Sequence, residues 1–379
     1  MGAHSGANCF GQQTTGLQLI AKCLPAHHNS LTKYPLPPAA GYVLAHLPYS
    51  QKMNNFSYTQ AATAKEATGR HKDTPQATYI AGGTTLLDLM KANLVEHPQL
   101  VDINLLPLSS IGQTKDGLRI GALARMSDVG EHPLVVQGYP AVSQSLLLAA
   151  SPQLRNMASI GGNLLQRTRC GYFRDPAFPC NKRVPGSGCP ALTGDNHNLA
   201  ILGVSDSCIA NAYPGDLSVA LTAFDAVLTL ENVKGKQRHV PVTEFYLLPG
   251  KTPQKETVLE PGELIVAVTI PAATHTQRSA YLKVRERSSY AYALASAAVG
   301  LDIQGGTIRA ARVALGGVGA QPWRSREAEK ALTGQPATEA SFRAAATAAL
   351  RGARPQRENA YKVELAQNTL VRALQQVAG

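Results

Sequence analysis

Four cysteines fall within one short window of this 379-residue chain, at Cys170, Cys180, Cys189 and Cys208. Four thiolates are the number that closes a tetrahedral zinc site or holds a four-iron cluster, so the window predicts a loop-rich fold built around a metal. It contains no Cys-x-x-Cys pair and therefore matches neither a zinc ribbon nor a ferredoxin-type run. The alternative is a set of unrelated buried or free cysteines.

The residues around these cysteines suit a metal loop. The stretch Cys180–Cys189 is rich in turn-forming residues. Cationic side chains lie between or beside the cysteines and would offset the charge of thiolates or of a cluster: Arg167, Arg169, Arg174, Lys182 and Arg183.

Composition indicates a soluble globular protein of two or three domains. Hydrophobic residues make up 44% and charged residues 16% of the sequence, both ordinary values. No run of about 18 apolar residues occurs, so no membrane span is expected. Six cysteines in total are too few for a disulfide scaffold, and the remaining two, Cys9 and Cys23, lie near the N-terminus.

The net charge of +11 raises the question of a nucleic-acid surface. The basic residues are scattered, however, and no nucleic-acid motif or aromatic platform accompanies them. A basic face for an anionic cofactor or an acidic partner subunit fits better. A solvated surface without a partner is the alternative.

Residues 1–52 differ from the rest of the chain, since the first acidic residue is Glu66. The segment shows neither a secretory signal nor the Arg-rich amphipathic pattern of a transit peptide. Met53 begins a stretch typical of a domain start. Residues 1–52 are therefore expected to be a disordered or non-native extension.

Helix and strand patterns alternate from Phe56 to about residue 275, and a sheet with packed helices follows. This order predicts an α+β chain with a domain boundary near residue 275. The expected helices are 59–70, 86–91, 126–131, 140–150, 216–224, 324–332, 339–351 and 358–377. The expected strands are 77–81, 100–103, 117–122, 226–230, 262–270, 280–285, 294–303 and 308–315, the last three in one antiparallel sheet. Residues 271–277 are expected to be a linker.

Two glycine-rich stretches offer backbone N–H groups to an anion. In Tyr79–Asp88 a strand ends in Gly82-Gly83 and a helix starts directly afterwards, with Thr hydroxyls close by. The second stretch, Ser159–Asn163, repeats the consecutive glycines. Neither is a dinucleotide fingerprint or a Walker loop. Together they could clamp both phosphates of one dinucleotide; the alternative is two unrelated turns.

From Met53 onward the chain resembles the FAD-binding subunits of molybdenum hydroxylases, the xanthine dehydrogenase and aldehyde oxidoreductase group. The motifs that carry the resemblance are Ile80–Leu87, Ser159–Asn163, Tyr213–Asp216, Gly262–Val266 and Tyr281–Lys283. The cysteine insertion, about residues 164–210, looks most like that of the flavoprotein subunit of bacterial periplasmic aldehyde oxidoreductase.

This resemblance implies a fold of two parts. Residues 53–273 would form an FAD-binding domain of the vanillyl-alcohol oxidase-like (PCMH) type. Residues 277–379 would form a C-terminal domain like that of the carbon monoxide dehydrogenase flavoprotein, with an antiparallel sheet and packed helices.

The resemblance also implies site residues. The FAD pyrophosphate would be gripped by Ile80, Ala81, Gly82, Gly83, Thr84, Thr85, Leu86 and Leu87 together with Ser159, Ile160, Gly161, Gly162 and Asn163. Asp216 would bind FAD, and Ile265 and Lys283 would line the flavin region. The four cysteines would hold an extra [4Fe–4S] cluster. The alternatives are a helix-capping role for Asp216, a core role for Ile265 and a surface cation at Lys283.

The implied function is electron transfer in a molybdenum-dependent aldehyde oxidoreductase, with no catalytic side chain in this subunit. A large partner with the molybdenum cofactor would convert aldehyde and water to carboxylic acid, and a small partner with [2Fe–2S] clusters would pass electrons to FAD. The acceptor would be a redox protein, a quinone or oxygen rather than a nicotinamide.

Two rival functions remain at this stage. The first keeps the fold and changes the complex to a xanthine dehydrogenase, a carbon monoxide dehydrogenase or an aromatic acyl-CoA reductase. The second is a zinc-stabilised assembly module without flavin. With no export signal in this chain, the expected location is the cytoplasm, or the periplasm if a partner subunit's signal exports the folded complex.

Overall fold

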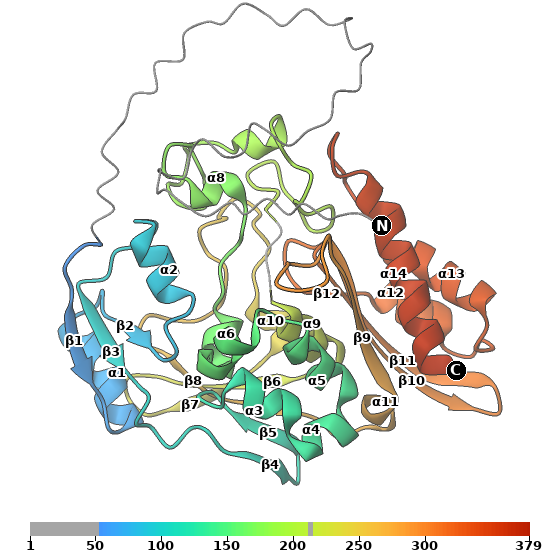
Figure 1. Ribbon diagram of the computed structural model, residues 1–379, viewed down its shortest axis with the longest axis horizontal. Helices are drawn as coiled ribbons and strands as arrows, with labels where there is room; N and C mark the ends of the chain where they lie inside the picture. The colour runs from blue at the N-terminus through green and yellow to red at the C-terminus, as the bar shows by residue number, and fades with distance from the viewer. Residues whose placement is uncertain (1–52, 211–214) are drawn as a thin grey trace, which may run out of the picture. The chain divides into compact units, whose positions relative to one another are not determined.

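A five-stranded antiparallel sheet is the base on which the N-terminal part of the chain is built (Figure 1). The structure is a computed structural model that describes residues 53–210 and 215–379. In spatial order the strands of this sheet are β4 (Ile111–Thr114), β5 (Gly117–Gly121), β8 (Leu264–Ile270), β6 (Val227–Glu231) and β7 (Gln237–Pro241). The central strand β8 reads Leu-Ile-Val-Ala-Val-Thr-Ile, and every residue except Thr269 is buried, as expected of a β-branched run between two neighbours.

Helices cover this sheet and complete its hydrophobic core. Buried residues of β5, β6 and β8 form one core with those of α3 (Met126–Glu131), α5 (Pro140–Leu147) and α9 (Asp216–Ala223). Short helices adjoin them: α4 (Pro133–Gly138), α6 (Pro152–Met157), α7 (Ile160–Leu164) and α10 (Val242–Phe245). The core places the first residues of α7 and α9 near one another, where the candidate site lies.

A small parallel sheet precedes it in the chain. Its strands are β1 (Ser57–Gln60), β3 (Gln99–Asp102) and β2 (Thr78–Ile80), in that spatial order. Parallel neighbours need crossover connections, which α1 (Ala64–Asp73) and α2 (Leu86–Lys91) supply. Leu264 and Val266 of β8 pack in the core of this sheet, which joins it to the five-stranded sheet.

The C-terminal part is a four-stranded antiparallel sheet covered by helices (Figure 1). Its strands are β12 (Trp323–Arg324), β11 (Thr307–Gly316), β10 (Ala295–Gln304) and β9 (Ser279–Val284). The covering helices are α12 (Arg326–Leu332), α13 (Glu339–Ala349) and α14 (Tyr361–Ala378). The predicted antiparallel sheet and the three helices are thus confirmed. Ile201 and Leu202, from the cysteine insertion, also pack in this core.

The structure corrects several predicted elements. The helix expected over 59–70 is wrong at its start, because Ser57–Gln60 form β1 and the helix begins at Ala64. Thr63 caps it by accepting from the Glu66 amide, while the Glu66 carboxylate accepts from the Ala62 amide. The expected linker 271–277 contains one helical turn, α11 (Thr274–Gln277).

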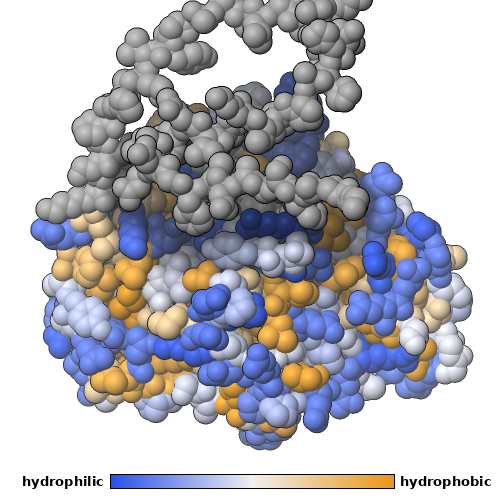
Figure 2. Space-filling view, in the orientation of Figure 1, coloured by the Kyte–Doolittle hydropathy of each residue, from blue (hydrophilic) through white to orange (hydrophobic). Residues whose placement is uncertain are grey.

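Some expectations fall outside the described residues: the extension 1–52 with Cys9 and Cys23, and the motif residues Tyr213 and Pro214. Within residues 53–210 and 215–379, no helix combines the length and the apolar character needed to cross a bilayer. On the face drawn in Figure 2, hydrophobic residues form small patches among hydrophilic ones.

His275 in α11 gives the fold a defined response to acid. Its ring stacks on Phe224, with the ring centroids 6.2 Å apart. Burial, assisted by the Arg312 guanidinium, lowers the pKa of His275 to about 4, although Asp225 opposes the shift. The unfolded imidazole titrates near 6.5, so between about pH 6.5 and pH 4 only the unfolded state takes up this proton.

We therefore expect the free energy of unfolding to fall by about 1–2 kcal/mol as the pH drops through this window, allowing for the partial exposure of the ring. His275→Gln should lack this part of the pH dependence. Urea unfolding across a pH series measures it. An unchanged pH dependence in the variant would contradict the assignment to His275.

Candidate cofactor site

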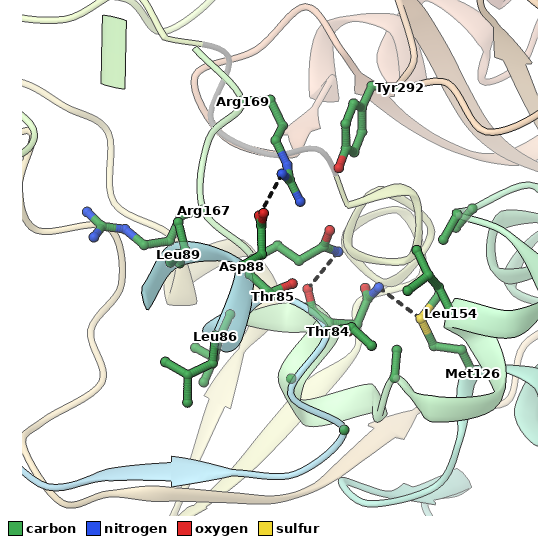
Figure 3. Close-up of a pocket in the computed structure, with 18 of the residues that line it drawn as sticks. Thr84, Thr85, Leu86, Asp88, Leu89, Met126, Leu154, Arg167, Arg169 and Tyr292 are labelled. Atoms are coloured by element: carbon green, nitrogen blue, oxygen red, sulfur yellow. Dashed lines mark hydrogen bonds and ion pairs between the residues drawn. The ribbon is translucent and has the colours of Figure 1, made fainter. Parts of the chain in front are cut away.

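One large cavity, of about 1020 Å³, lies where β2, α2, α7, α9, β9 and the cysteine insertion meet. Its size is at the upper end of the range for small-molecule pockets, about 300–1,000 Å³. Figure 3 shows part of its wall, with Thr84, Thr85 and Leu86 on one side and Met126 and Leu154 on another. The residues that line the cavity come from segments spread along the chain between Thr78 and Leu294.

The first glycine loop connects β2 to α2 and touches the Met157–Ala158 backbone, which leads into the second loop. A Cβ on Gly82 would lie 1.9 Å from the Met157 carbonyl oxygen, so only glycine fits there. Gly83 has φ +69°, a left-handed conformation that glycine adopts without strain. The two glycines therefore do different work: Gly82 permits close approach, and Gly83 permits the turn.

The second glycine loop is fixed by its own capping hydrogen bond and by β5. Ser159 Oγ accepts from the Gly162 amide at 3.2 Å, and the Gly161 amide donates to the Ala122 carbonyl at 2.8 Å. Asn163 is only 7% exposed, and its Nδ2 lies 3.2 Å from Met126 Sδ (Figure 3). Its Oδ1 is buried without a partner, and Asn163 is one of the residues that line the cavity. A ligand N–H or O–H group would satisfy this oxygen.

A side-chain bridge outside the cavity ties the first loop to the end of α6, just before the second loop. Arg125 donates to the Met157 carbonyl at 2.5 Å and to Asn104 Oδ1 at 3.0 Å. Asn104 Nδ2 in turn donates to the Ala81 carbonyl at 3.2 Å. The relative position of the loops is therefore set by protein contacts before any ligand binds.

A buried ion pair forms another part of the wall. Lys283 Nζ lies 2.7 Å from Asp216 Oδ2, and the Tyr281 hydroxyl donates to Asp216 Oδ1 at 2.6 Å. The side chains of Lys283 and Asp216 are 2% and 5% exposed. Burial raises the pKa of Asp216, and the nearby Lys283 ammonium opposes this rise. Burial, together with the neighbouring Asp216 carboxylate, raises the pKa of Tyr281. Asp216 is the first residue of α9, so the helix fixes its backbone, and Tyr281 and Lys283 of β9 stabilise its charge.

Arginines of the cysteine insertion close one side of the cavity. Arg169 pairs with Asp88 of α2 at 3.0 Å and stacks over the Tyr292 ring at 5.2 Å (Figure 3). Arg167 pairs with Glu256 at 2.5 Å. The insertion thus contributes cationic wall to a cavity whose other walls come from the two glycine loops and the buried ion pair.

The four cysteines of the insertion come together around a second, much smaller cavity of about 10 Å³. All four are free thiols, and Cys170 and Cys208 are buried. Burial raises the pKa of Cys170 to about 11. The Cys208 thiol donates a hydrogen bond to Cys189, which lowers the pKa of Cys189 to about 6 and raises that of Cys208. Among the described residues, no group of three or more His, Cys, Asp or Glu is arranged to hold a metal ion.

Most predicted cofactor residues lie together at the large cavity. Those at its wall are Ile80, Ala81, Gly82, Gly83, Thr84, Thr85, Leu86, Ser159, Gly162, Asn163, Asp216 and Lys283. The others do not reach the wall: Leu87, Ile160, Gly161 and Ile265. Ile265 is 4% exposed and packs in the core of the five-stranded sheet, as the core alternative expects.

Sequence reasoning missed several wall residues. The loop after β9 contributes Tyr290 and Tyr292, and the insertion contributes Asn198 and Leu199. Arg167 and Arg169 were expected only beside the cysteines, yet they line the large cavity. In the sequence, Arg167 and Arg169 lie between the second glycine loop and Cys170. This is the one sequence signal that they could reach both the cysteines and the large cavity.

Comparison with known proteins gives the same family over both parts of the chain. Residues 54–273 match the family described as FAD binding domain in molybdopterin dehydrogenase, and residues 280–377 match the CO dehydrogenase flavoprotein C-terminal domain. The chain is 45% identical over 323 residues to the aldehyde oxidoreductase FAD-binding subunit PaoB of Escherichia coli, covering 85% of this chain and 98% of that protein. It is 27% identical over 282 residues to the glyceraldehyde dehydrogenase medium chain of Sulfolobus acidocaldarius, covering 74% and 82%.

A solved structure supports the fold. The carbon monoxide dehydrogenase of Hydrogenophaga pseudoflava lacking the Mo-pyranopterin moiety aligns with a TM-score of 0.67 at 26% identity. The alignment covers 86% of this chain and 98% of that chain. The α+β fold of an FAD-binding part followed by a flavoprotein C-terminal part is confirmed.

Proposed function

The chain belongs to the FAD-binding subunits of the molybdenum hydroxylase family, which are oxidoreductase subunits, and we propose on that premise that it carries electrons for an aldehyde oxidoreductase. One structural observation carries the proposal. Both glycine loops and the buried Asp216–Lys283 pair converge on a single cavity large enough for a dinucleotide.

The residues present fit FAD. The pyrophosphate would lie against the loops Ile80–Leu86 and Ser159–Asn163, where backbone N–H groups and hydroxyls favour an anion. Leu87, Ile160 and Gly161 would act from behind, holding the loops in place. Asn163 Oδ1 would accept from the cofactor, which would satisfy its missing hydrogen bond. When bound, FAD supplies the redox chemistry, since a flavin can take up electrons in pairs or one at a time. This chain orients the cofactor and limits access of water to it.

Asp216 and Lys283 would hold the polar groups of FAD through a fixed charge arrangement. The Tyr281 hydroxyl donates to Asp216 Oδ1 and Lys283 Nζ donates to Asp216 Oδ2, so the carboxylate cannot rotate freely. Lys283 also donates to the Leu148 carbonyl at 3.2 Å. A rigid ion pair of this kind can orient a ligand without reorganising when the ligand binds.

For the cysteine cavity we propose a [4Fe–4S] cluster on Cys170, Cys180, Cys189 and Cys208. The donor set supports it: four free thiols, two of them buried, on a loop-built segment. The cavity of about 10 Å³ leaves room for roughly one water, so the sulfurs would move outward on loading.

The proposed complex has two partners. A large subunit would hold the molybdenum cofactor and convert aldehyde and water to carboxylic acid, and a small subunit would hold [2Fe–2S] clusters. PaoB, an aldehyde oxidoreductase subunit by name, supports the aldehyde over a purine or carbon monoxide as substrate. Activity of the purified complex on aldehydes against purines and carbon monoxide distinguishes these, and preference for either of the latter would contradict the aldehyde proposal.

Purification of the complex tests the cofactors directly. The expected result is flavin absorption together with about four irons and four sulfides assigned to this chain. A colourless protein with one zinc ion would contradict the proposal and support a zinc-stabilised assembly module instead.

Cys189→Ser should abolish the four-iron signal, because the cluster needs four thiolate ligands and a serine hydroxyl does not replace one of them. Iron and sulfide analysis with electron paramagnetic resonance of the reduced protein measures the effect. Cys23→Ser is the matched control and should keep the full iron content. Retention of all four irons in Cys189→Ser would exclude Cys189 as a ligand.

A further inference from the structure

The stretch of the insertion between Cys189 and Cys208 is bonded, residue by residue, to the start of α14. The Asn196 amide donates to Glu358 Oε2 at 3.2 Å, and the Glu358 amide donates to Asn196 Oδ1 at 3.1 Å. Asn359 Nδ2 donates to the carbonyls of Leu199 and Ala200 at 3.4 and 3.3 Å. The bonded residues are 159 to 162 positions apart in sequence, so the contacts join two distant parts of the chain.

Lys362 completes this set of bonds with a charge. Its side chain is fully buried, and Nζ donates to the Asn198 carbonyl at 3.1 Å and to the Gly317 carbonyl at 2.8 Å. No carboxylate among the described residues forms an ion pair with it. A buried ammonium is costly, and here it is directed at two backbone carbonyls, one of which belongs to the insertion.

The segment held in this way lies at the large cavity and adjoins the hydrophobic cluster of the cysteines. Asn198 and Leu199 line the large cavity. Leu199 also belongs to the hydrophobic cluster that contains Cys170 and Cys208, as does Leu89 of α2, which again lines the large cavity. Leu89 and Leu199 thus line the large cavity and also pack in the hydrophobic cluster that holds the cysteines.

We propose that Glu358, Asn359 and Lys362 are positioning residues: they fix Asn198–Leu199 at the large cavity, beside the hydrophobic cluster of the cysteines. This inference rests on the proposed function for its importance to electron transfer, because the segment adjoins both proposed cofactor sites. The contacts themselves stand independently of which cofactors bind.

Hydrogen–deuterium exchange on the purified complex tests the proposal. In Lys362→Met, the carbonyls of Asn198 and Gly317 lose their donor while the side-chain volume is nearly kept. The expected result is exchange about tenfold faster at residues 196–202, with no change in α12 and α13. Arg372→Met, on an exposed position of the same helix, is the matched control and should leave residues 196–202 unchanged.

A second pair of variants covers the case in which Lys362→Met fails to fold. Glu358→Ala removes the acceptor for the Asn196 amide, and Glu358→Gln keeps an oxygen there. Faster exchange at residues 196–202 in the alanine variant, reversed in the glutamine variant, is expected. Wild-type exchange in Glu358→Ala, or equal acceleration over the whole chain in Lys362→Met, would overturn the positioning role.

The same samples separate this inference from the proposed function. Flavin and iron are measured on the wild-type complex, and their absence would contradict the cofactors. The exchange pattern decides the positioning role whether or not cofactors are found.

Discussion

Gly82→Ala is expected to lower FAD affinity at least about 100-fold, or about 3 kcal/mol. The added Cβ would lie 1.9 Å from the Met157 carbonyl oxygen, a backbone atom that cannot rotate away. The first glycine loop must therefore shift away from the Met157–Ala158 backbone, which leads into the second loop, and the phosphate clamp proposed between the loops opens. Flavin content of the purified complex and fluorescence titration with FAD measure the loss.

Gly69→Ala provides the matched control. Gly69 lies inside α1, and a Cβ there meets nothing within 4 Å. The control should retain FAD and gain up to about 1 kcal/mol of stability, because alanine favours a helix over glycine. Full FAD binding by Gly82→Ala would show that the loops do not hold the pyrophosphate.

Breaking the Asp216–Lys283 pair is expected to produce the largest loss of stability. Asp216→Leu leaves the Lys283 ammonium buried at 2% exposure without its partner. Removing one member of a buried pair typically costs about 3–5 kcal/mol. The double variant Asp216→Leu/Lys283→Met has no unpaired charge and should recover most of this free energy of unfolding. Denaturant unfolding of Asp216→Leu, Lys283→Met and the double variant measures the difference.

FAD binding should not recover with stability. If the pair orients FAD, the double variant is stable but binds the cofactor as weakly as the single variants. Arg343→Met is the control, since Arg343 and Glu339 form an exposed pair with side chains 61% and 53% exposed. Its effect should stay below about 1 kcal/mol. A double variant that binds FAD normally would leave the pair with a structural role only.

The fold was predictable wherever local signals agree with tertiary packing. The helices 86–91 and 126–131 have the predicted bounds, and the run of β-branched residues in β8 is as clear in the sequence as in the sheet. Short strands such as β4 and β7 carry no distinctive pattern, because they are sheet edges with partly exposed residues. Their pairing partners, not their own residues, make them strands.

The site was predictable in part for the same reason. Glycine loops and clustered cysteines are visible locally, and both glycine loops do meet at one cavity. The contributions of Asn198, Leu199 and Tyr292 depend on contacts between distant segments, which no local pattern encodes. Ile265 lies inside a family motif and packs in the core, so its sequence context alone does not distinguish the two expected roles.

The order of synthesis determines when the bonds between Asn196 and Glu358 can form. The two residues are 162 positions apart, so at about 5–20 residues per second the ribosome adds Glu358 roughly 8–30 s after Asn196. From the addition of Cys208 until the end of that interval all four cysteines have been made, but Glu358, which is bonded to their neighbour Asn196, has not. The bonds that hold this part of the insertion therefore form only after the cysteines have been synthesised. A nascent chain that has not yet reached Glu358 carries all four thiols without this support.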